Sequence, residues 1–183
     1  MITKSPIRNN IRLKNYDYSQ NGYYFITICT HNRENLFGKI INGKMVLNEY
    51  GNIVNKEWLV SAKIRKEIKI DKFVVMPNHF HAIVIIQNVG MYGNTSANTD
   101  ENQKRMYIHT SLQSPSHTLG AMIRGFKSSG TAKINTIRNT EQNPVWQKSY
   151  YDHIIRNEQD YKEIYEYIEN NPQKWELDKY YIL

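Results

Sequence analysis

Residues 76–86 read MPNHFHAIVII, and this stretch decides the kind of fold that the chain can adopt. A Pro77-Asn78 turn is followed by apolar, mostly β-branched residues, the composition of a buried strand. The preceding residues 68–75, IKIDKFVV, have a similar composition. Their near-continuous apolarity predicts two strands separated by the turn, both central in a sheet and covered on both faces.

A further strand, a hairpin and a helix are predicted before this pair. Residues 23–30 form an apolar, β-branched run after an Asn21-Gly22 turn, which is typical of a buried strand. Asn42-Gly43 lies between two short apolar runs, and this is the strongest short-range signal for a hairpin. Asn48 is suited to the N-cap of a helix. One apolar stripe recurs at helical spacing after it: Tyr50, Ile53, Val54 and Trp58.

The second half of the chain opens with a polar stretch in which apolar residues recur at neither helical nor strand spacing. We expect a long mobile loop over about residues 89–115. A helix is predicted next, with Ser114 as its N-cap and Pro115 in its first turn. Its apolar face is predicted to hold Leu119, Met122, Ile123 and Phe126.

A short strand is expected within residues 144–157, and a last helix is expected to begin at Asn157 and to end at Pro172. Helices and strands in this order predict a single domain over residues 1–183. The simplest layering is an α+β sandwich, in which helices pack on a central antiparallel sheet.

The composition narrows the classes of partner. The 183 residues carry a formal net charge of +7 and include 14 tyrosines, which favours an acidic partner such as a nucleic acid. Cys29 is the only cysteine, so an intrachain disulfide and a cysteine-based zinc site are excluded. No apolar run approaches the roughly 20 residues that span a bilayer, and the first ten residues lack the apolar core of a secretory signal. A cytoplasmic protein without membrane contact is therefore expected.

Two histidines stand at the start of the second strand. Side chains alternate faces along a strand, so His79 and His81 share one face and Phe80 points to the other. Two imidazoles separated by about 7 Å of strand can converge on one divalent cation. Two solvent-facing histidines at a strand end are the alternative.

The last helix presents a tyrosine apart from its apolar face. At roughly 100° per residue, Tyr161 and Tyr165 cluster with Ile164 and Ile168. Tyr167 falls to the side of that stripe, and Asn171, four positions later, shares its side. This arrangement is unusual for packing and suits a hydroxyl and an amide that must reach a ligand.

These motifs carry a resemblance to a known family. MPNHFHAIV resembles the His-hydrophobe-His motif of the HUH nucleases. Residues 151–172, YDHIIRNEQDYKEIYEYIENNP, resemble the C-terminal signature of the REP-associated tyrosine transposases, which are single-tyrosine HUH transposases. Residues 12–33 and the segment IRGFKSS, residues 123–129, are also similar to that family. The resemblance extends from about residue 11 to residue 175, apart from the loop.

The resemblance implies a ferredoxin-like domain, similar to an RNA-recognition motif, that cleaves and rejoins single-stranded DNA near hairpins. It implies that Tyr167 is the nucleophile, that His79 and His81 bind the metal, and that Asn171 is the third residue on the metal side. Mixed imidazole and amide ligands suit Mg²⁺ or Mn²⁺. The REP-associated branch also implies a monomer that acts alone, although dimers occur among insertion-sequence relatives.

Basic residues are the candidates for DNA contacts. Arg124, Lys127 and Lys133 lie off the apolar face of the second predicted helix and face either solvent or phosphates. His153 and Arg156 lie in the YDHIIR segment that the resemblance covers. Two alternatives remain: a nucleic-acid-binding module without catalysis, and a replication or plasmid-transfer nickase, some of which use two tyrosines on one helix.

Overall fold

The computed structural model describes residues 16–87 and 118–182, and its centre is a four-stranded antiparallel sheet. The strands are β1 (Gly22–Cys29), β4 (Ile68–Val75), β5 (His79–Ile86) and β6 (Tyr151–Ile155). Their order across the sheet is β4-β5-β1-β6, and every neighbouring pair is antiparallel. The predicted α+β sandwich with a central antiparallel sheet is confirmed. The connection β1-α1-β4-β5-α3-β6 is that of a ferredoxin-like domain.

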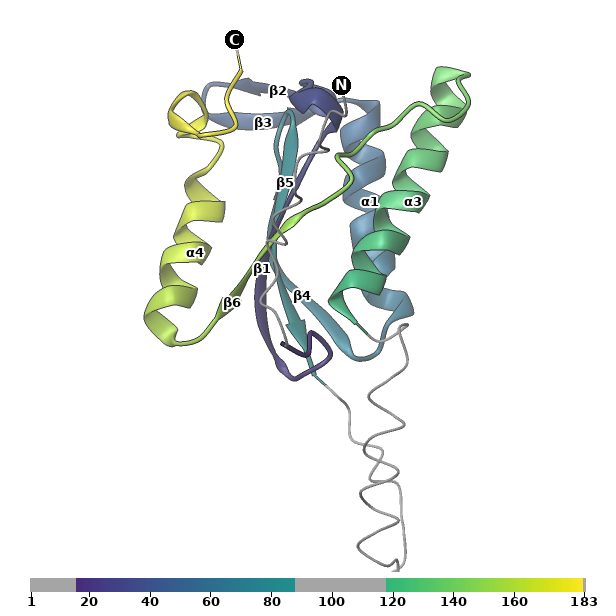
Figure 1. The fold of residues 1–183 in the computed structure, drawn as a ribbon. Helices are drawn as coiled ribbons and strands as arrows, with labels where there is room; N and C mark the ends of the chain where they lie inside the picture. The colour runs from purple at the N-terminus through teal and green to yellow at the C-terminus, as the bar shows by residue number, and fades with distance from the viewer. Residues whose placement is uncertain (1–15, 88–117, 183) are drawn as a thin grey trace, which may run out of the picture.

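Three helices cover the two faces of the sheet (Figure 1). They are α1 (Glu49–Ile64), α3 (Leu119–Arg138) and α4 (Glu158–Asn170). The helices α1 and α3 pack side by side on one face, where Trp58, Phe80 and Phe126 form the aromatic centre of the larger core. The helix α4 lies alone on the other face, over the smaller core. The described part of the chain contains no helix that is long and apolar enough to cross a bilayer.

The local signals placed most elements correctly. The hairpin pairs β2 (Gly38–Ile41) with β3 (Lys44–Leu47), and Asn42 and Gly43 at its turn both have positive φ, 50° and 70°. This backbone is the two-residue turn that matches the twist of the flanking strands. The Asn48 side chain accepts a hydrogen bond from the Gly51 amide and so caps α1 as expected.

Two expectations about the elements are wrong. β4 is an edge strand rather than a central one, and its polar Lys69, Asp71 and Lys72 suit an edge that meets solvent. The helix α3 begins at Leu119 with Thr118 as its N-cap, since the Thr118 side chain accepts from the Ala121 amide. The expected loop over residues 89–115, together with the Ser114-Pro115 cap, lies outside the described residues.

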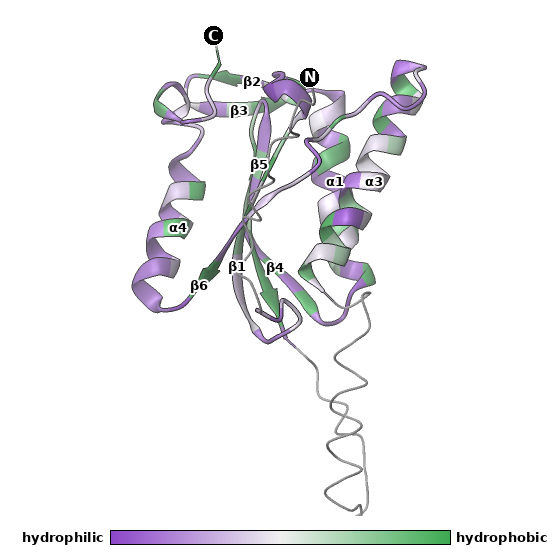
Figure 2. Ribbon diagram, in the orientation of Figure 1, coloured by the Kyte–Doolittle hydropathy of each residue, from purple (hydrophilic) through white to green (hydrophobic). Residues whose placement is uncertain are grey.

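The smaller core and a pair of polar contacts hold α4 against the sheet. Ile168 is buried with Phe25 and Ile83, while Figure 2 shows the rest of α4 mostly in hydrophilic colours. The register of β4 shifts between Ile70 and Phe73, and the two residues in between reach α4. Tyr161 donates to Asp71 at 2.6 Å, and Lys72 pairs with Glu169 at 2.9 Å. The irregularity thus re-aims two strand side chains toward the helix.

Candidate metal and tyrosine site

The two histidines of β5 are buried on the face of the sheet that α4 covers. His79 and His81 are both fully buried, and their rings lie 4.4 Å apart. Phe80 points to the opposite face and packs against Trp58 and Phe126. The alternation of β5 therefore separates the histidine pair from the larger core. The alternative of two solvent-facing histidines does not hold.

Hydrogen bonds fix the tautomer of His79. Asn78 donates its Nδ2 to the Tyr180 carbonyl at 2.7 Å, so its Oδ1 faces His79. Because this oxygen only accepts, Nδ1 of His79 carries the proton and donates it at 2.9 Å. The lone pair of His79 is then on Nε2, which is buried and has no partner among the described residues.

The orientation of the His81 ring is fixed by Thr27 on the neighbouring strand β1. Its Nδ1 lies 2.8 Å from Oγ1 of Thr27, and its Nε2 lies 3.2 Å from the Tyr167 hydroxyl. When Nδ1 donates to Thr27, Nε2 carries the lone pair and can ligate a metal, while the Tyr167 hydroxyl donates its single proton to Asp178. Burial lowers the pKa of His79 to about 4 and that of His81 well below its ordinary value. Both imidazoles are therefore neutral at pH 7, the state in which they ligate metals.

The helix α4 brings Tyr167 and Asn171 to the histidines. Tyr167 is 37% exposed, and its hydroxyl lies against His81. Asn171 follows the last residue of α4 and is buried. Tyr161 and Tyr165 pack with the smaller core instead, as their position in the apolar stripe predicts. The Lys72 ammonium lies 4.7 Å from the centre of the Tyr165 ring, so Tyr165 is engaged away from the site.

Asp178 belongs to this site although the sequence did not single it out. It follows the short 3-10 helix η3 (Trp175–Leu177), and its Oδ2 accepts from the Tyr167 hydroxyl at 3.1 Å and from the Asn171 amide. Its Oδ1 accepts from the Tyr180 amide at 2.7 Å. One ligand atom each of His79, His81 and Asp178 lies within 4.8 Å of the other two. Only its place in a short segment beyond the last helix could have drawn attention to it.

The tyrosine keeps its proton in this environment. Burial, together with the charge and the hydrogen bond of Asp178, raises the pKa of Tyr167 above its ordinary value. A tyrosine oxygen must lose its proton to become a strong nucleophile. Asp178 Oδ2, which already accepts the hydrogen bond, is placed to take that proton.

The residues fit a divalent cation. Buried polar atoms normally have a hydrogen-bond partner. Nε2 of His79 and Oδ1 of Asn171 are both buried without one among the described residues. The Asn171 side chain is also close enough to His79 to favour its protonated form, although burial outweighs that effect on the pKa. Two unpartnered acceptors beside a carboxylate form a suitable donor set for a metal ion.

The basic residues predicted on α3 are not brought to this site. The helix α3 covers the opposite face of the sheet (Figure 1). Lys127 donates its ammonium to the carbonyls of Gln147 and Lys148, at 2.6 and 3.1 Å. Lys133 pairs with Glu57 of α1, and Arg124 is exposed.

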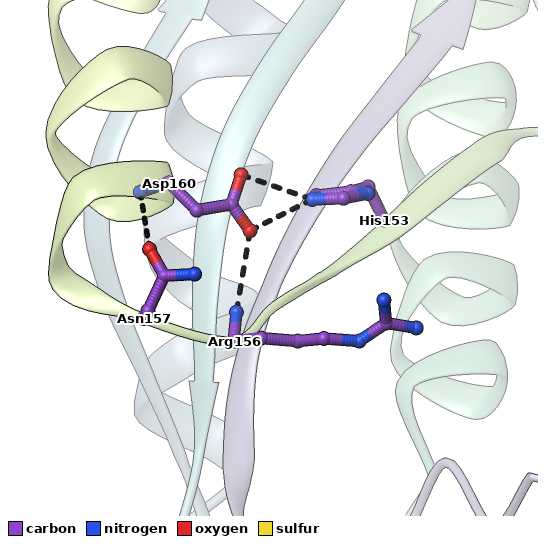
Figure 3. Close-up of polar contacts among 4 residues, drawn as sticks. All are labelled: His153, Arg156, Asn157 and Asp160. Atoms are coloured by element: carbon purple, nitrogen blue, oxygen red, sulfur yellow. Dashed lines mark hydrogen bonds and ion pairs between the residues drawn. The ribbon is translucent and has the colours of Figure 1, made fainter.

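His153 and Arg156 lie where β6 leads into α4 (Figure 3). The Asp160 carboxylate lies 2.9 Å from Nε2 of His153 and accepts from the Arg156 amide at 3.2 Å. These bonds outweigh the effect of partial burial and lower the pKa of Asp160. The Asp160 amide in turn donates to Asn157, which caps α4. His153 therefore helps to fix the start of α4, and the Arg156 guanidinium extends away from the cluster.

Two known proteins resemble this chain, one in its fold and the other in its sequence. A solved structure described as a REP-associated tyrosine transposase bound to a REP hairpin superposes with a TM-score of 0.57, at 20% identity, over 92% of this chain and 76% of that one. The chain therefore has the fold of that class of transposase. No protein-family model matches. An uncharacterised protein of Haemophilus influenzae is 43% identical over 176 residues, which are 96% of this chain and 93% of that protein. The chain belongs to the same family as that Haemophilus protein.

Proposed function

We propose that this protein is a single-stranded DNA endonuclease and strand transferase that cleaves DNA beside hairpins through a covalent link to Tyr167. The observation that carries the proposal is the position of the Tyr167 hydroxyl, 3.2 Å from Nε2 of His81 and 3.1 Å from Oδ2 of Asp178. A nucleophile, a proton acceptor and a candidate metal site thus meet at one point.

The metal would be held by Nε2 of His79, Nε2 of His81 and Oδ1 of Asn171, with the Asp178 carboxylate beside them. Imidazole and amide donors suit Mn²⁺ or Mg²⁺. Such an ion, when bound, polarises the phosphate oxygens and stabilises the negative charge that develops on them. Asn78 and Thr27 hold the two imidazoles in the orientation that this role requires.

The bond changes follow from the contacts of Tyr167. Its hydroxyl proton moves to Oδ2 of Asp178 as the oxygen attacks the phosphorus. The bond between phosphorus and the 3′ oxygen breaks, and this oxygen leaves with the proton from Asp178. The products are a 5′-phosphotyrosine and a free 3′-OH. Attack of a 3′-OH on the phosphotyrosine reverses the step and rejoins strands without ATP, because the covalent link retains the bond energy.

The DNA partner is inferred from charge and from the structural neighbour. The net charge of +7 favours a polyanion, and the neighbour with the same fold is described as bound to a REP hairpin. We infer a hairpin with adjacent single-stranded DNA, which the protein would process either to move an element or to act on scattered repeats. The docking of α4 on its own sheet supports a monomer in which one chain supplies the whole site.

A nickase with two tyrosines is less consistent with the site. Tyr165 packs in the smaller core beneath the Lys72 ammonium, whereas the Tyr167 hydroxyl reaches the histidines. A nucleic-acid-binding module without catalysis would use the same surfaces. It would not need, beside a tyrosine, two buried acceptors that have no partner among the residues that the structure describes.

The test is an adduct assay with a pool of hairpin oligonucleotides that carry randomised single-stranded flanks. The pool is labelled at either end and incubated with Mn²⁺, and the products are separated on a denaturing gel. We expect a protein-linked band from DNA labelled at the 3′ end, and a shortened free strand from DNA labelled at the 5′ end. EDTA should abolish both. The absence of any adduct with wild-type protein would contradict the proposal.

A further inference from the structure

Two cations flank an aromatic ring that lies on the histidine pair. The Tyr180 ring is 4.7 Å from the ring of His79 and 5.8 Å from that of His81. The Arg33 guanidinium lies 5.5 Å from the centre of the Tyr180 ring, and the Lys179 ammonium lies 5.0 Å from it. Arg33 and Lys179, called here the cation pair, thus border the site on the side of β1 and the C-terminal segment.

The backbone at Arg33 is held in a sparsely populated conformation. Asn32 and Arg33 have φ of 53° and 59°. Asn tolerates the left-handed region, so the cost of this backbone falls on Arg33. Hydrogen bonds of the two preceding residues hold the segment, since the His31 amide donates to the Val145 carbonyl and the Thr30 hydroxyl to the Asn78 carbonyl. Strain that the surroundings impose is common at functional sites. Here the imposed conformation is anchored to Asn78, the residue that orients His79.

Within the described part of the chain, the cation pair has no ion-pair partner. Both side chains are exposed, and neither forms an ion pair with a carboxylate of the described residues. Lys133, in contrast, is paired with Glu57, and Lys72 with Glu169. A contact between an exposed cation and an aromatic ring is weak, so both groups stay available for an anion.

The side of Tyr167 that faces along α4 is acidic. A cavity of about 330 Å³ lies beside its ring. The lining includes Glu163, Glu166, Asn170, Asn171, Lys174 and Asp178. Phosphates that lie along α4 would meet Glu163 and Glu166, and like charges repel. A DNA strand at Tyr167 is therefore favoured to run toward the cation pair and away from α4.

We propose that Arg33 and Lys179 bind the backbone phosphates of single-stranded DNA next to the cleaved bond and so position that bond at Tyr167. This inference rests on the proposed function for the position of the cleaved bond. It assigns phosphate binding to the end of β1 and the C-terminal segment, on the face of the sheet that carries the site. The Arg124, Lys127 and Lys133 set lies on the other face.

Binding is measured first, so that it does not depend on cleavage. The Tyr167→Phe protein is titrated with a fluorescent hairpin oligonucleotide that has single-stranded flanks, at a series of KCl concentrations. Arg33→Gln and Lys179→Gln are compared with Lys63→Gln, which removes an exposed cation of α1 on the opposite layer. Each phosphate contact on single strands contributes about 0.7 to the slope of log affinity against log salt. We expect the slope to fall by about 0.7 for each single variant and by about 1.4 for the pair, with no change for Lys63→Gln.

Charge-retaining variants and the adduct assay complete the test. Arg33→Lys and Lys179→Arg should keep the salt slope, because the charge remains. If the double variant matches Lys63→Gln in affinity and slope, the inference is wrong, even when wild-type protein forms adducts. If the slope falls as expected while wild-type protein forms no adduct, the phosphate contacts stand and the proposed catalysis fails. Circular dichroism checks that the exposed substitutions leave the fold intact.

Discussion

The Tyr167 hydroxyl lies 3.2 Å from Nε2 of His81, although 86 positions separate the two residues in the sequence. Their rings are 5.1 Å apart and inclined at 62°. This contact exists because Ile168, the next residue of α4, is buried against the sheet. The burial of one aliphatic side chain thus places the hydroxyl of its neighbour at the histidine pair.

Tyr167→Phe should stop adduct formation and leave the fold almost unchanged. The substitution removes one oxygen and keeps the ring packed near Phe25, so the loss of folding free energy should be within about 1 kcal/mol. Tyr165→Phe, on the same helix, should cleave like the wild type. Peptide mapping of the trapped adduct identifies the linked residue, and a label on Tyr161 or Tyr165 would refute the assignment.

Divalent cations should stabilise the folded protein through the histidine pair. A ligand at 100 times its dissociation constant adds about 2.7 kcal/mol, which raises the Tm of a domain of this size by roughly 5–10 °C. We expect Mn²⁺ to raise the Tm of the wild type but not of His79→Asn or His81→Asn. His153→Asn, which removes an imidazole outside the site, should keep the shift.

The same histidine variants separate metal binding from DNA binding. They should form no adduct and yet bind the hairpin oligonucleotide nearly as well as the wild type, because DNA affinity arises from phosphate contacts and stacking. Cleavage by His79→Asn or His81→Asn at wild-type rates would show that neither imidazole takes part.

Asp178→Asn should slow adduct formation by about a hundredfold or more. The amide keeps the size of the side chain but cannot take the Tyr167 proton, and positioned general bases contribute about 10²–10⁴-fold. Glu176→Gln, two positions earlier and exposed, is the matched control and should react normally. Single-turnover rates with saturating DNA and Mn²⁺ provide the measurement. An unchanged rate in Asp178→Asn would remove Asp178 from the mechanism.

The metal-free protein should lose stability between pH 6.5 and pH 4. Burial lowers the pKa of His79 from 6.5 to about 4, so the unfolded chain binds more protons than the folded one within this window. The stability that this histidine contributes is fully present above pH 6.5 and is lost as the pH falls toward 4. The loss should reach roughly 3 kcal/mol. Urea denaturation in EDTA should show a flatter pH dependence for His79→Gln than for the wild type, and parallel curves would contradict this reading.

One chain should supply the complete site. The helix α4 contacts its own sheet through the Tyr161–Asp71 hydrogen bond, the Lys72–Glu169 ion pair and the burial of Ile168. A mixture of Tyr167→Phe and His79→Asn proteins should therefore form no adduct. In control mixtures, either variant added to wild-type protein should leave the wild-type activity unchanged. Restored activity in the mixture of variants would show that two chains exchange their tyrosine helices.

The sequence by itself determined the elements and the faces of their side chains. Asn42-Gly43, Asn48 and Asn157 mark a turn and two helix starts, because these side chains and backbones satisfy local hydrogen bonds. Alternation along β5 places His79 and His81 on one face, and the helical period sets Tyr167 apart from the apolar stripe of α4. These properties depend on residues within a few positions of one another, so they can be read locally.

Only the tertiary structure decided which distant groups meet. Thr27 and Asn78 orient the imidazoles, Asp178 reaches Tyr167 from beyond the last helix, and Arg33 comes to the Tyr180 ring from the end of β1. Tertiary packing also decided that β4 lies at an edge of the sheet and that the α3 cations lie on the face opposite the site. These contacts result from the packing of a sheet between two helix layers. That packing minimises the free energy of the whole chain, so no local pattern in the sequence encodes it.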